Sequence, residues 1–240
     1  MEINYNSIKE ANRQYHNKHA SQYDEFSMRG NFSRVEPMFK KYAGGIFLDM
    51  GCGTGEQLKI AKKYFDDVYG IDCSEEMVKL TKEITENVVT GDVASIPFES
   101  KFDFINCYSV LHHLYDQEPL IREAYRLLKT GGIFYSDNDP NHSFYKLFKW
   151  WLLFRRRFLR KKNCVLSKEM KELEKLAEYH AKGLDINKLV ELFKKVGFRS
   201  IKVEYHYPDK PDLFTKILIF HNKLLKMKSL FYYFSLTAVK

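Results

Sequence analysis

A glycine-rich turn between an apolar segment and a helical one constrains the fold more than any other feature of this chain. Residues 46–50 are apolar except for Asp49, as in a buried strand, and they run directly into Gly51-Cys52-Gly53-Thr54-Gly55. Apolar residues recur at helical spacing in the stretch 56–64 that follows. Glycines at alternate positions let the backbone approach a ligand that a Cβ atom would hold away. The sequence therefore predicts a strand, a ligand-binding turn and a helix.

The spacing of the glycines narrows the choice of ligand. A dinucleotide-binding turn needs a third glycine three residues after the second, and Glu56 stands at that position. A Walker phosphate loop closes with Gly-Lys-Ser/Thr, whereas Gly55-Glu56-Gln57 supplies no lysine. These differences argue against NAD, FAD, ATP and GTP.

Residues 47–55 resemble the first motif of the class I methyltransferases that use S-adenosylmethionine. In that family a hydrophobic residue precedes Asp-x-Gly-x-Gly-x-Gly, and Asp49, Gly51, Gly53 and Gly55 match the pattern. The resemblance implies that backbone amides of the turn, with Cys52 beside them, hold the amino-acid part of S-adenosylmethionine.

Two aspartates follow where the family holds the rest of the cofactor. Asp72 ends a second apolar segment 21 residues after Gly51, close to the offset of about 20 residues at which an acid meets a ribose diol in such folds. Ser74 is expected to cap the next helix through Met77, which leaves Asp72 for the ligand. Asp92 ends a third strand and, by resemblance, meets the adenine amino group. The predicted cofactor site also includes the neighbours Cys73 and Val93.

Later segments complete the same pattern. A fourth strand is expected at 102–107, followed by Tyr108 and a loop at 109–114 that is similar to the family's acceptor-side loop. The run 126–134 resembles the helix, double-glycine turn and fifth strand of these enzymes. The ordered matches imply a three-layer α/β sandwich of Rossmann-like type, with a seven-stranded, mostly parallel sheet and an antiparallel seventh strand beside the fifth. A ligand then binds at the carboxyl ends of the strands, at the switch point between the first and fourth.

The chain length favours one domain with additions. The 240 residues, 45% of them hydrophobic, are enough for one sizeable core and too few for two domains with linkers. Strands are expected at 200–207 and 230–239, and a helix from residue 185 should end at Gly197. The predicted parts are an amino-terminal lid at 1–32, a cofactor-binding core at 33–140, a basic and aromatic helical insertion at 141–182, and the carboxyl-terminal part of the sheet at 183–240, with a helical insertion at 208–228.

Three features indicate a reducing compartment and no membrane span. The four cysteines form no C-x-x-C pair and no cluster with histidine, so neither a metal site nor a disulfide framework is predicted. No signal peptide is evident at the amino terminus. The apolar block at 150–154 has five residues, against the roughly 20 that cross a bilayer. We therefore expect a cytoplasmic protein.

The positive charge is concentrated in one segment. The net charge is +8, and residues 141–162 hold eight basic side chains and no acidic one. As a helix, this segment places aromatic and aliphatic residues on one face and cations on the other; the apolar set is Phe144, Leu147, Phe148, Trp151, Phe154 and Phe158. Such a helix suits an anionic membrane surface, a protein partner or a phosphate backbone. In the first case the protein would be peripheral on the inner face of a membrane. An equally favoured interpretation is that its apolar face closes the active-site pocket and its cations are simply solvated.

The chemistry of the cofactor sets what the site must contain. A sulfonium methyl group leaves by in-line displacement, so the protein must hold an acceptor lone pair close to it and aligned with the breaking bond. A hydroxyl or acidic-carbon acceptor benefits from a base. His113, or its neighbour His112, follows the fourth strand on the correct side of the sheet, although one of the pair is as readily a packed structural residue. Tyr23, Tyr108 and Phe144 are candidates for an aromatic wall, with Tyr23 also resembling the tyrosine that covers the cofactor in small-molecule methyltransferases.

The motifs are most similar to those of the ubiquinone and menaquinone biosynthesis type. Together with the basic segment, this similarity predicts a small-molecule or hydrophobic, lipid-linked acceptor. An Asn/Asp-Pro-Pro-aromatic motif after the fourth strand is absent, which argues against adenine N6 or glutamine acceptors. Two alternatives are an RNA-directed methyltransferase that uses the basic segment 146–162 and a non-catalytic S-adenosylmethionine-binding assembly protein. Nucleic acid is the less favoured partner, and the oligomeric state is left open.

Overall fold

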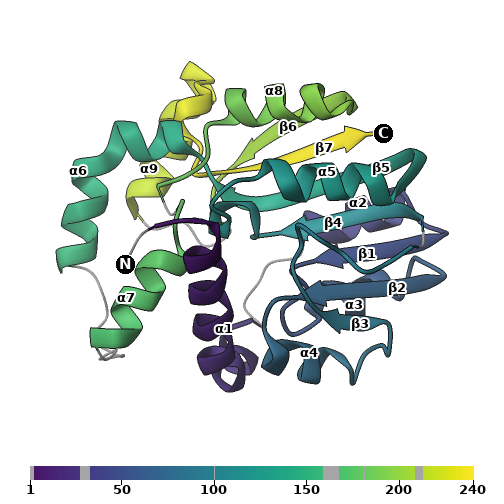
Figure 1. Ribbon diagram of the computed structural model, residues 1–240. Coiled ribbons are helices and arrows are strands. Elements are labelled where there is room, and N and C mark those ends of the chain that lie inside the picture. The colour runs from purple at the N-terminus through teal and green to yellow at the C-terminus, as the bar shows by residue number, and fades with distance from the viewer. Residues whose placement is uncertain (1–2, 28–32, 100, 159–167, 181, 209–212) are drawn as a thin grey trace.

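The strands form one seven-stranded sheet in the order β3-β2-β1-β4-β5-β7-β6 (Figure 1). The computed structural model describes residues 3–27, 33–99, 101–158, 168–180, 182–208 and 213–240. All neighbouring strands pair in parallel except β7, which is antiparallel to both β5 and β6. The predicted fold class is confirmed. The strands are β1 (Ile46–Met50), β2 (Asp67–Asp72), β3 (Val88–Thr90), β4 (Phe102–Tyr108), β5 (Leu128–Pro140), β6 (Arg199–His206) and β7 (Tyr233–Val239).

Helices cover both faces of the sheet because its buried strands alternate apolar side chains between two sides. On one face, Phe47 and Phe104 pack against α2 (Val35–Lys41), α3 (Glu56–Ala61) and α4 (Glu75–Thr81). On the other, Leu48 and Ile105 pack against α5 (Glu118–Leu127) and α8 (Ile186–Val196). These two cores fix β1 and β4 between them, and with them the start of the glycine-rich turn.

Several local predictions are confirmed by hydrogen bonds. The Ser74 hydroxyl accepts a hydrogen bond from the Met77 amide at 3.1 Å and caps α4. Asp185 caps α8 by accepting from the amide of Asn187 at 3.1 Å. That helix ends at Gly197, whose φ of 118° is in the left-handed region that favours glycine.

Other boundaries differ from the sequence prediction. β5 already begins at Leu128, so the double glycine lies inside an irregular strand instead of preceding it. Helix α6 (His142–Phe158) is kinked at Phe148, where φ is −107° and ψ is 19°. An unbroken helix would place Leu147 on the packed face, but Leu147 is 54% exposed. That part of the helical projection was wrong, because it assumed a straight helix.

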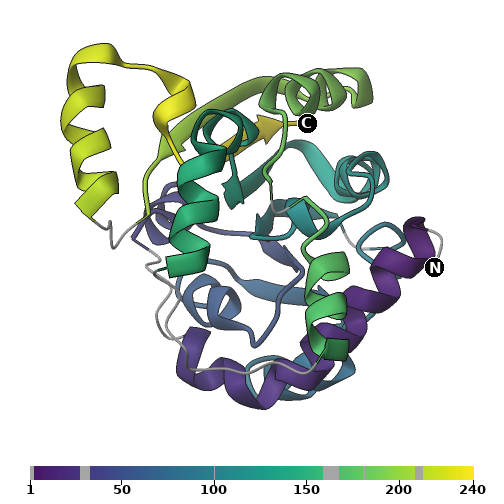
Figure 2. The same ribbon diagram turned by 90° about the vertical axis from the view of Figure 1, so that its left-hand side faces the viewer.

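Helix α1 (Tyr5–Ser27) lies with α7 (Lys168–Ala177) across the carboxyl ends of the parallel strands (Figures 1 and 2). Lys18 and Glu169 join the two helices by an ion pair of 2.9 Å. Asn17 accepts a hydrogen bond from the Ser74 hydroxyl at 2.6 Å and so ties α1 to the cap of α4. The amino-terminal segment is therefore fastened over the end of the sheet where a ligand is expected.

Candidate functional site

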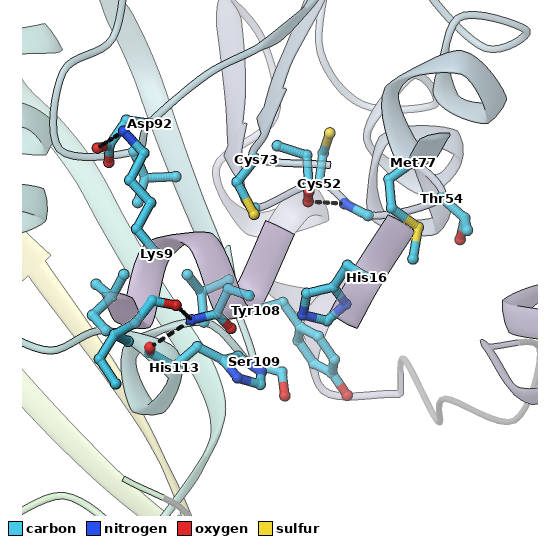
Figure 3. Close-up of a pocket in the computed structure, with 18 of the residues that line it drawn as sticks. Lys9, His16, Cys52, Thr54, Cys73, Met77, Asp92, Tyr108, Ser109 and His113 are labelled. Carbon is cyan, nitrogen blue, oxygen red and sulfur yellow. Dashed lines mark hydrogen bonds and ion pairs between the residues drawn. The ribbon is translucent and has the colours of Figure 1, made fainter. Parts of the chain in front are cut away.

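A cavity of about 370 Å³ opens at the carboxyl ends of β1, β2 and β4, underneath α1 (Figure 3). This size is within the usual range for small-molecule sites. Asp49 and His112 are not among its lining residues, and the side chain of Tyr23 lies outside the part of the chain that the structure describes. The predicted residues that do line it are Gly51, Cys52, Gly53, Asp72, Cys73, Asp92, Val93, Tyr108 and His113.

The glycine-rich turn approaches the cavity through its backbone. Gly51, Gly53 and Gly55 have φ values of 78°, 51° and 83°, which L side chains rarely adopt. A Cβ atom on Gly53 would meet no heavy atom within 4 Å and would project into the open space. The turn is therefore a cradle that a side chain would fill, as an adenosylmethionine site requires.

Four amides of this turn are hydrogen-bonded within the protein. Gly51 and Cys52 both donate to the Ile71 carbonyl oxygen, at 2.8 and 3.0 Å, and Gly55 donates to the Cys52 carbonyl oxygen at 2.9 Å. Gly53 donates to a carboxylate oxygen of Asp72 at 2.9 Å. These four amides hold the turn in shape and bring its backbone close to the cavity. That the turn also holds the amino-acid part of the cofactor stays a prediction.

Asp72 joins the turn to the start of α4. One carboxylate oxygen accepts from Gly53, and the other accepts from the Ser74 amide at 2.9 Å. Burial raises the pKa of Asp72, and these two hydrogen bonds oppose the rise. Asp72 also lines the cavity, so its carboxylate lies at the wall where a ribose diol is predicted.

Asp92 is held by α1 as well as by its own loop. Its Oδ2 atom accepts from the Tyr5 hydroxyl at 2.6 Å and from Lys9 Nζ at 2.7 Å, while Oδ1 accepts from the Ala94 amide at 2.9 Å. Burial opposes ionisation of this carboxylate, but the bonds from Lys9 and Tyr5 outweigh it and lower its pKa. Figure 3 shows Lys9 reaching from α1 to Asp92 across the cavity.

One face of α1 supplies a set of cavity residues that the sequence reading missed. They recur three or four positions apart, the spacing of a single helix face. Asn12 is 7% exposed and donates from Nδ2 to the carbonyl oxygens of Ile8 and His113, both at 3.0 Å. Its Oδ1 atom has no hydrogen-bond partner among the described residues, so a buried acceptor stands at the cavity wall. The α1 residues that line the cavity are Tyr5, Ile8, Lys9, Asn12 and His16.

His112 is buried in an ionic cluster behind the cavity. Its Nδ1 atom is 2.8 Å from Oδ1 of Asp139, a fully buried carboxylate that also accepts from the Ser136 hydroxyl at 2.8 Å. Burial opposes a charge on His112, but the bond to Asp139 outweighs it and raises the pKa of the imidazole. His112 is thus held in place by Asp139 and is not among the residues that line the cavity.

His113 lines the cavity and has the opposite electrostatic setting. Burial, assisted by the charge of His112, lowers its pKa to about 4; the two ring centroids are 4.1 Å apart. Its Nδ1 atom is 2.8 Å from the carbonyl oxygen of Ala177. A carbonyl can only accept, so Nδ1 carries the hydrogen and Nε2 is the nitrogen left to take a proton.

Together with Glu178, the two histidines form a group of side chains among the described residues whose spacing could hold a metal ion. Ligand atoms of His112, His113 and Glu178 lie within 4.8 Å of one another. Both Nδ1 atoms are already hydrogen-bonded, to Asp139 and to Ala177 respectively. Each imidazole is therefore already held by a protein group at one ring nitrogen.

The ends of β4 and β5 bring two strained residues to the cavity. Ser109 and Asn138 have φ values of 60° and 65°, and Asn138 Nδ2 donates to the Ser109 hydroxyl at 3.3 Å. Both residues line the cavity. Such backbone strain gathers at functional sites. Ser109 lies in the loop 109–114, where acceptor-side residues are expected, and Asn138 lies beside it near the end of β5.

Asp49 and Phe144 are placed away from the cavity. Asp49 is 1% exposed beneath the turn, where Asn106 Nδ2 donates to its Oδ1 atom at 2.8 Å. Burial raises the pKa of Asp49 to about 7, against the effect of that hydrogen bond. Phe144 packs instead on Phe148 and Tyr232, with ring centroids 4.7 and 4.8 Å away, so it is not a wall of this pocket.

Comparisons with known proteins agree with this geometry. A family model described as a methyltransferase domain matches residues 48–136. The demethylmenaquinone methyltransferase of Staphylococcus haemolyticus is 30% identical over 172 residues, which are 67% of this chain and 71% of that protein. An uncharacterized protein of Methanocaldococcus jannaschii, MJ1252, is 37% identical over 129 residues, 51% of this chain and about half (49%) of its own length.

Solved structures share the fold. A SAM-dependent methyltransferase from Archaeoglobus fulgidus superimposes with a TM-score of 0.59 at 20% identity, covering 92% of this chain and 99% of that one. The phosphoethanolamine N-methyltransferase 2 of Haemonchus contortus, solved in complex with S-adenosyl-L-methionine, gives a TM-score of 0.57 at 21% identity and covers 88% of this chain and 53% of that one.

Proposed function

The chain belongs to the class I S-adenosylmethionine-dependent methyltransferases, and we propose that it methylates a hydrophobic, lipid-linked small molecule. The observation that carries this proposal is the cavity itself. It runs from the glycine-rich turn to His113, and its other lining residues at that end include the apolar Val110 and Leu114. The demethylmenaquinone methyltransferases to which the chain is similar supply a first acceptor to test.

The cofactor contributes an electrophilic sulfonium methyl group when it is bound. The chain contributes placement: the cradle at Gly53 admits the cofactor, and Asp72 and Asp92 offer acceptors for its ribose and adenine. Mostly apolar walls exclude water, which favours the dispersal of charge as the methyl group transfers.

We assign His113 the role of general base. An acceptor hydroxyl or acidic carbon must lose a proton, and a neutral imidazole whose Nε2 atom is unprotonated can receive it. The low pKa of His113 keeps the ring neutral across the physiological range. The bond from His113 Nδ1 to the Ala177 carbonyl oxygen fixes the tautomer that this role needs.

The RNA-directed and non-catalytic alternatives are not favoured. Those relatives named above whose names give an activity are methyltransferases. The basic segment carries large exposed apolar side chains beside its cations, which suits lipid better than a phosphate backbone. A cytoplasmic location stays a prediction; among the described residues no helix is both long and apolar enough to cross a membrane.

The proposal is tested by following labelled methyl groups from S-adenosylmethionine into demethylmenaquinone, kept in its reduced hydroquinone form so that the ring is a nucleophile, in detergent micelles. The matched control is the same quinone ring without its prenyl tail. We expect kcat/KM to be roughly tenfold or more higher with the tail, because about 0.8 kcal/mol per buried CH₂ makes two methylene groups worth that factor. Equal turnover of both compounds, or label entering only an added RNA, would contradict the proposal.

A further inference from the structure

Two helices on the outside of the molecule carry most of its exposed large apolar side chains. Trp150 of α6 is 80% exposed and Phe220 of α9 (Leu213–Leu225) is 68% exposed. Among the described residues only Ile3 and Tyr115 are comparable elsewhere. The set on or beside the two helices is Leu147, Trp150, Leu213, Ile217, Phe220, Leu225 and Met227, and we call it the α6/α9 surface.

The two helices form a single unit. The ring of Trp151 in α6 stacks on Phe214 in α9 with centroids 3.8 Å apart, and Phe148 meets the same ring edge-on at 5.4 Å. These inner aromatics join the helices to each other. The exposed row is therefore a second apolar face, which the packing of α6 on α9 does not use.

Cations accompany this apolar face, and the residues of α6 and α9 themselves include no aspartate or glutamate. Between Pro140 and Lys168 and again after Asp212, the sequence contains no aspartate or glutamate. The exposed lysines are Lys146 and Lys149 on α6, Lys216 and Lys223 on α9, and Lys226 and Lys228 directly after it. The sequence analysis placed the excess of positive charge in the segment 141–162 and expected a separate helical insertion at 208–228; the structure joins α6 and α9 in one unit.

This combination identifies the occupant by its chemistry. Exposed tryptophan, phenylalanine and leucine beside lysine are typical of helices that lie in the interface of an anionic bilayer. An acidic protein partner would leave the apolar row uncovered, and a nucleic acid would leave it in contact with phosphate. A bilayer with anionic headgroups matches both the charge and the apolar residues at once.

We propose that α6 and α9 together form a docking surface for anionic lipid membranes. Figure 2 shows both helices on the side of the molecule where α1 and α7 cross the ends of the strands. Docking there brings the cavity side toward the lipid, where a lipid-linked acceptor would be held. This consequence rests on the proposed function, but the binding of the surface to lipid does not.

The test is sedimentation of the protein with vesicles of phosphatidylglycerol and phosphatidylcholine that contain no acceptor. The wild type is expected to sediment with them and to stay in solution with pure phosphatidylcholine. Lys216→Gln with Lys223→Gln should weaken binding about thirtyfold, since each lysine near such a surface is worth roughly 1 kcal/mol. Ile217→Ser with Phe220→Ser should weaken it further. Both pairs are on α9, so they test the part of the α6/α9 surface that lies outside the basic segment 141–162.

Matched controls are Lys79→Gln and Lys194→Gln, exposed lysines of α4 and α8. They should bind vesicles as the wild type does, and S-adenosylhomocysteine binding by every variant shows that the fold is intact. The proposal is overturned if the wild type stays in solution with anionic vesicles or if the α9 variants bind equally well. It is also overturned if the apolar variants convert a dimer to a monomer and leave lipid binding unchanged. Because these vesicles carry no acceptor, failure here is separate from failure of the methyl-transfer assay.

Discussion

Asp72→Asn is the substitution that probes the cofactor site most directly. The amide has nearly the shape of the carboxylate, but it has one acceptor oxygen where the wild type has two. In the wild type these oxygens accept from the amides of Gly53 and Ser74, both at 2.9 Å. In the variant, the side-chain NH₂ group must face one of those amides, which then has no acceptor. The variant therefore loses the negative charge and part of the support for the turn.

The expected sizes of the two effects follow from these contacts. Hydrogen bonds to a charged group are worth about 1.5 to 3 kcal/mol, so the dissociation constant for S-adenosylhomocysteine should rise roughly 10- to 150-fold. An unsatisfied buried amide costs about 1 to 3 kcal/mol, which should appear in the free energy of unfolding of the unliganded protein. Titration calorimetry measures the first effect and urea unfolding measures the second.

The control is Glu76→Gln, which removes the same charge from the first turn of α4, four residues after Asp72. Glu76 is partly exposed and pairs with Lys79 at 2.6 Å, and it does not line the cavity. Its affinity for S-adenosylhomocysteine should match that of the wild type. A dissociation constant for Asp72→Asn within twofold of the wild-type value would refute the assignment of Asp72 to the ribose.

The pH dependence gives an independent check of the same residue. Burial raises the pKa of Asp72 above its ordinary value. The ionised form accepts both ribose hydroxyls, so affinity should weaken as pH falls through that raised pKa, at a higher pH than for an ordinary aspartate. The asparagine variant has no proton to bind and should lack this part of the pH dependence.

Two further substitutions test His113, which lines the cavity, and Asp49, which lies beneath the turn. His113→Gln should lower kcat by about 10²- to 10⁴-fold with little change in S-adenosylhomocysteine affinity, and unchanged kcat would exclude the base. Because the pKa of His113 is about 4, wild-type kcat at saturating S-adenosylmethionine should stay level from pH 8 down to about pH 5, separate from the loss of cofactor affinity that protonation of Asp72 causes. Asp49 has a folded-state pKa of about 7, above its unfolded value, so its ionisation destabilises the fold as pH rises from about 4 to about 7. Asp49→Asn should remove that slope and stabilise the unliganded protein at pH 8 by roughly 1 to 4 kcal/mol, as measured by urea unfolding, and a less stable variant would contradict the reasoning.

The sequence predicted those parts of the site that depend on local patterns. The turn at Gly51, Gly53 and Gly55 and the strand-end acids Asp72 and Asp92 could be located because alternation and glycine spacing act within a few residues. The face of α1 could not be found in that way. Tyr5 contacts Asp92 across 87 positions of sequence, and Asn12 contacts His113 across 101. Contacts of this range depend on how a helix docks, which a residue pattern does not contain.

The division of roles between the two histidines shows the same limit. The sequence offers His112 and His113 as equivalent neighbours after a strand. In the structure Asp139, 27 positions away, bonds only His112, while the Ala177 carbonyl oxygen, 64 positions away, bonds His113. The difference in their pKa values therefore arises from tertiary contacts. Only the structure separates His112, which Asp139 holds away from the cavity, from His113, the candidate base.

Helix α1 connects the two ends of the proposed reaction. Through Tyr5 and Lys9 it bonds the carboxylate predicted to meet adenine, and through Asn12 it bonds the backbone of the candidate base. An adenine amino group at Asp92 must share that carboxylate with Tyr5 and Lys9, because Oδ2 already accepts from both. We therefore expect cofactor binding and the position of α1 to be coupled. Since Asn12 of the same helix bonds the backbone of His113, we also expect the placement of the candidate base to depend on the occupancy of the cofactor site.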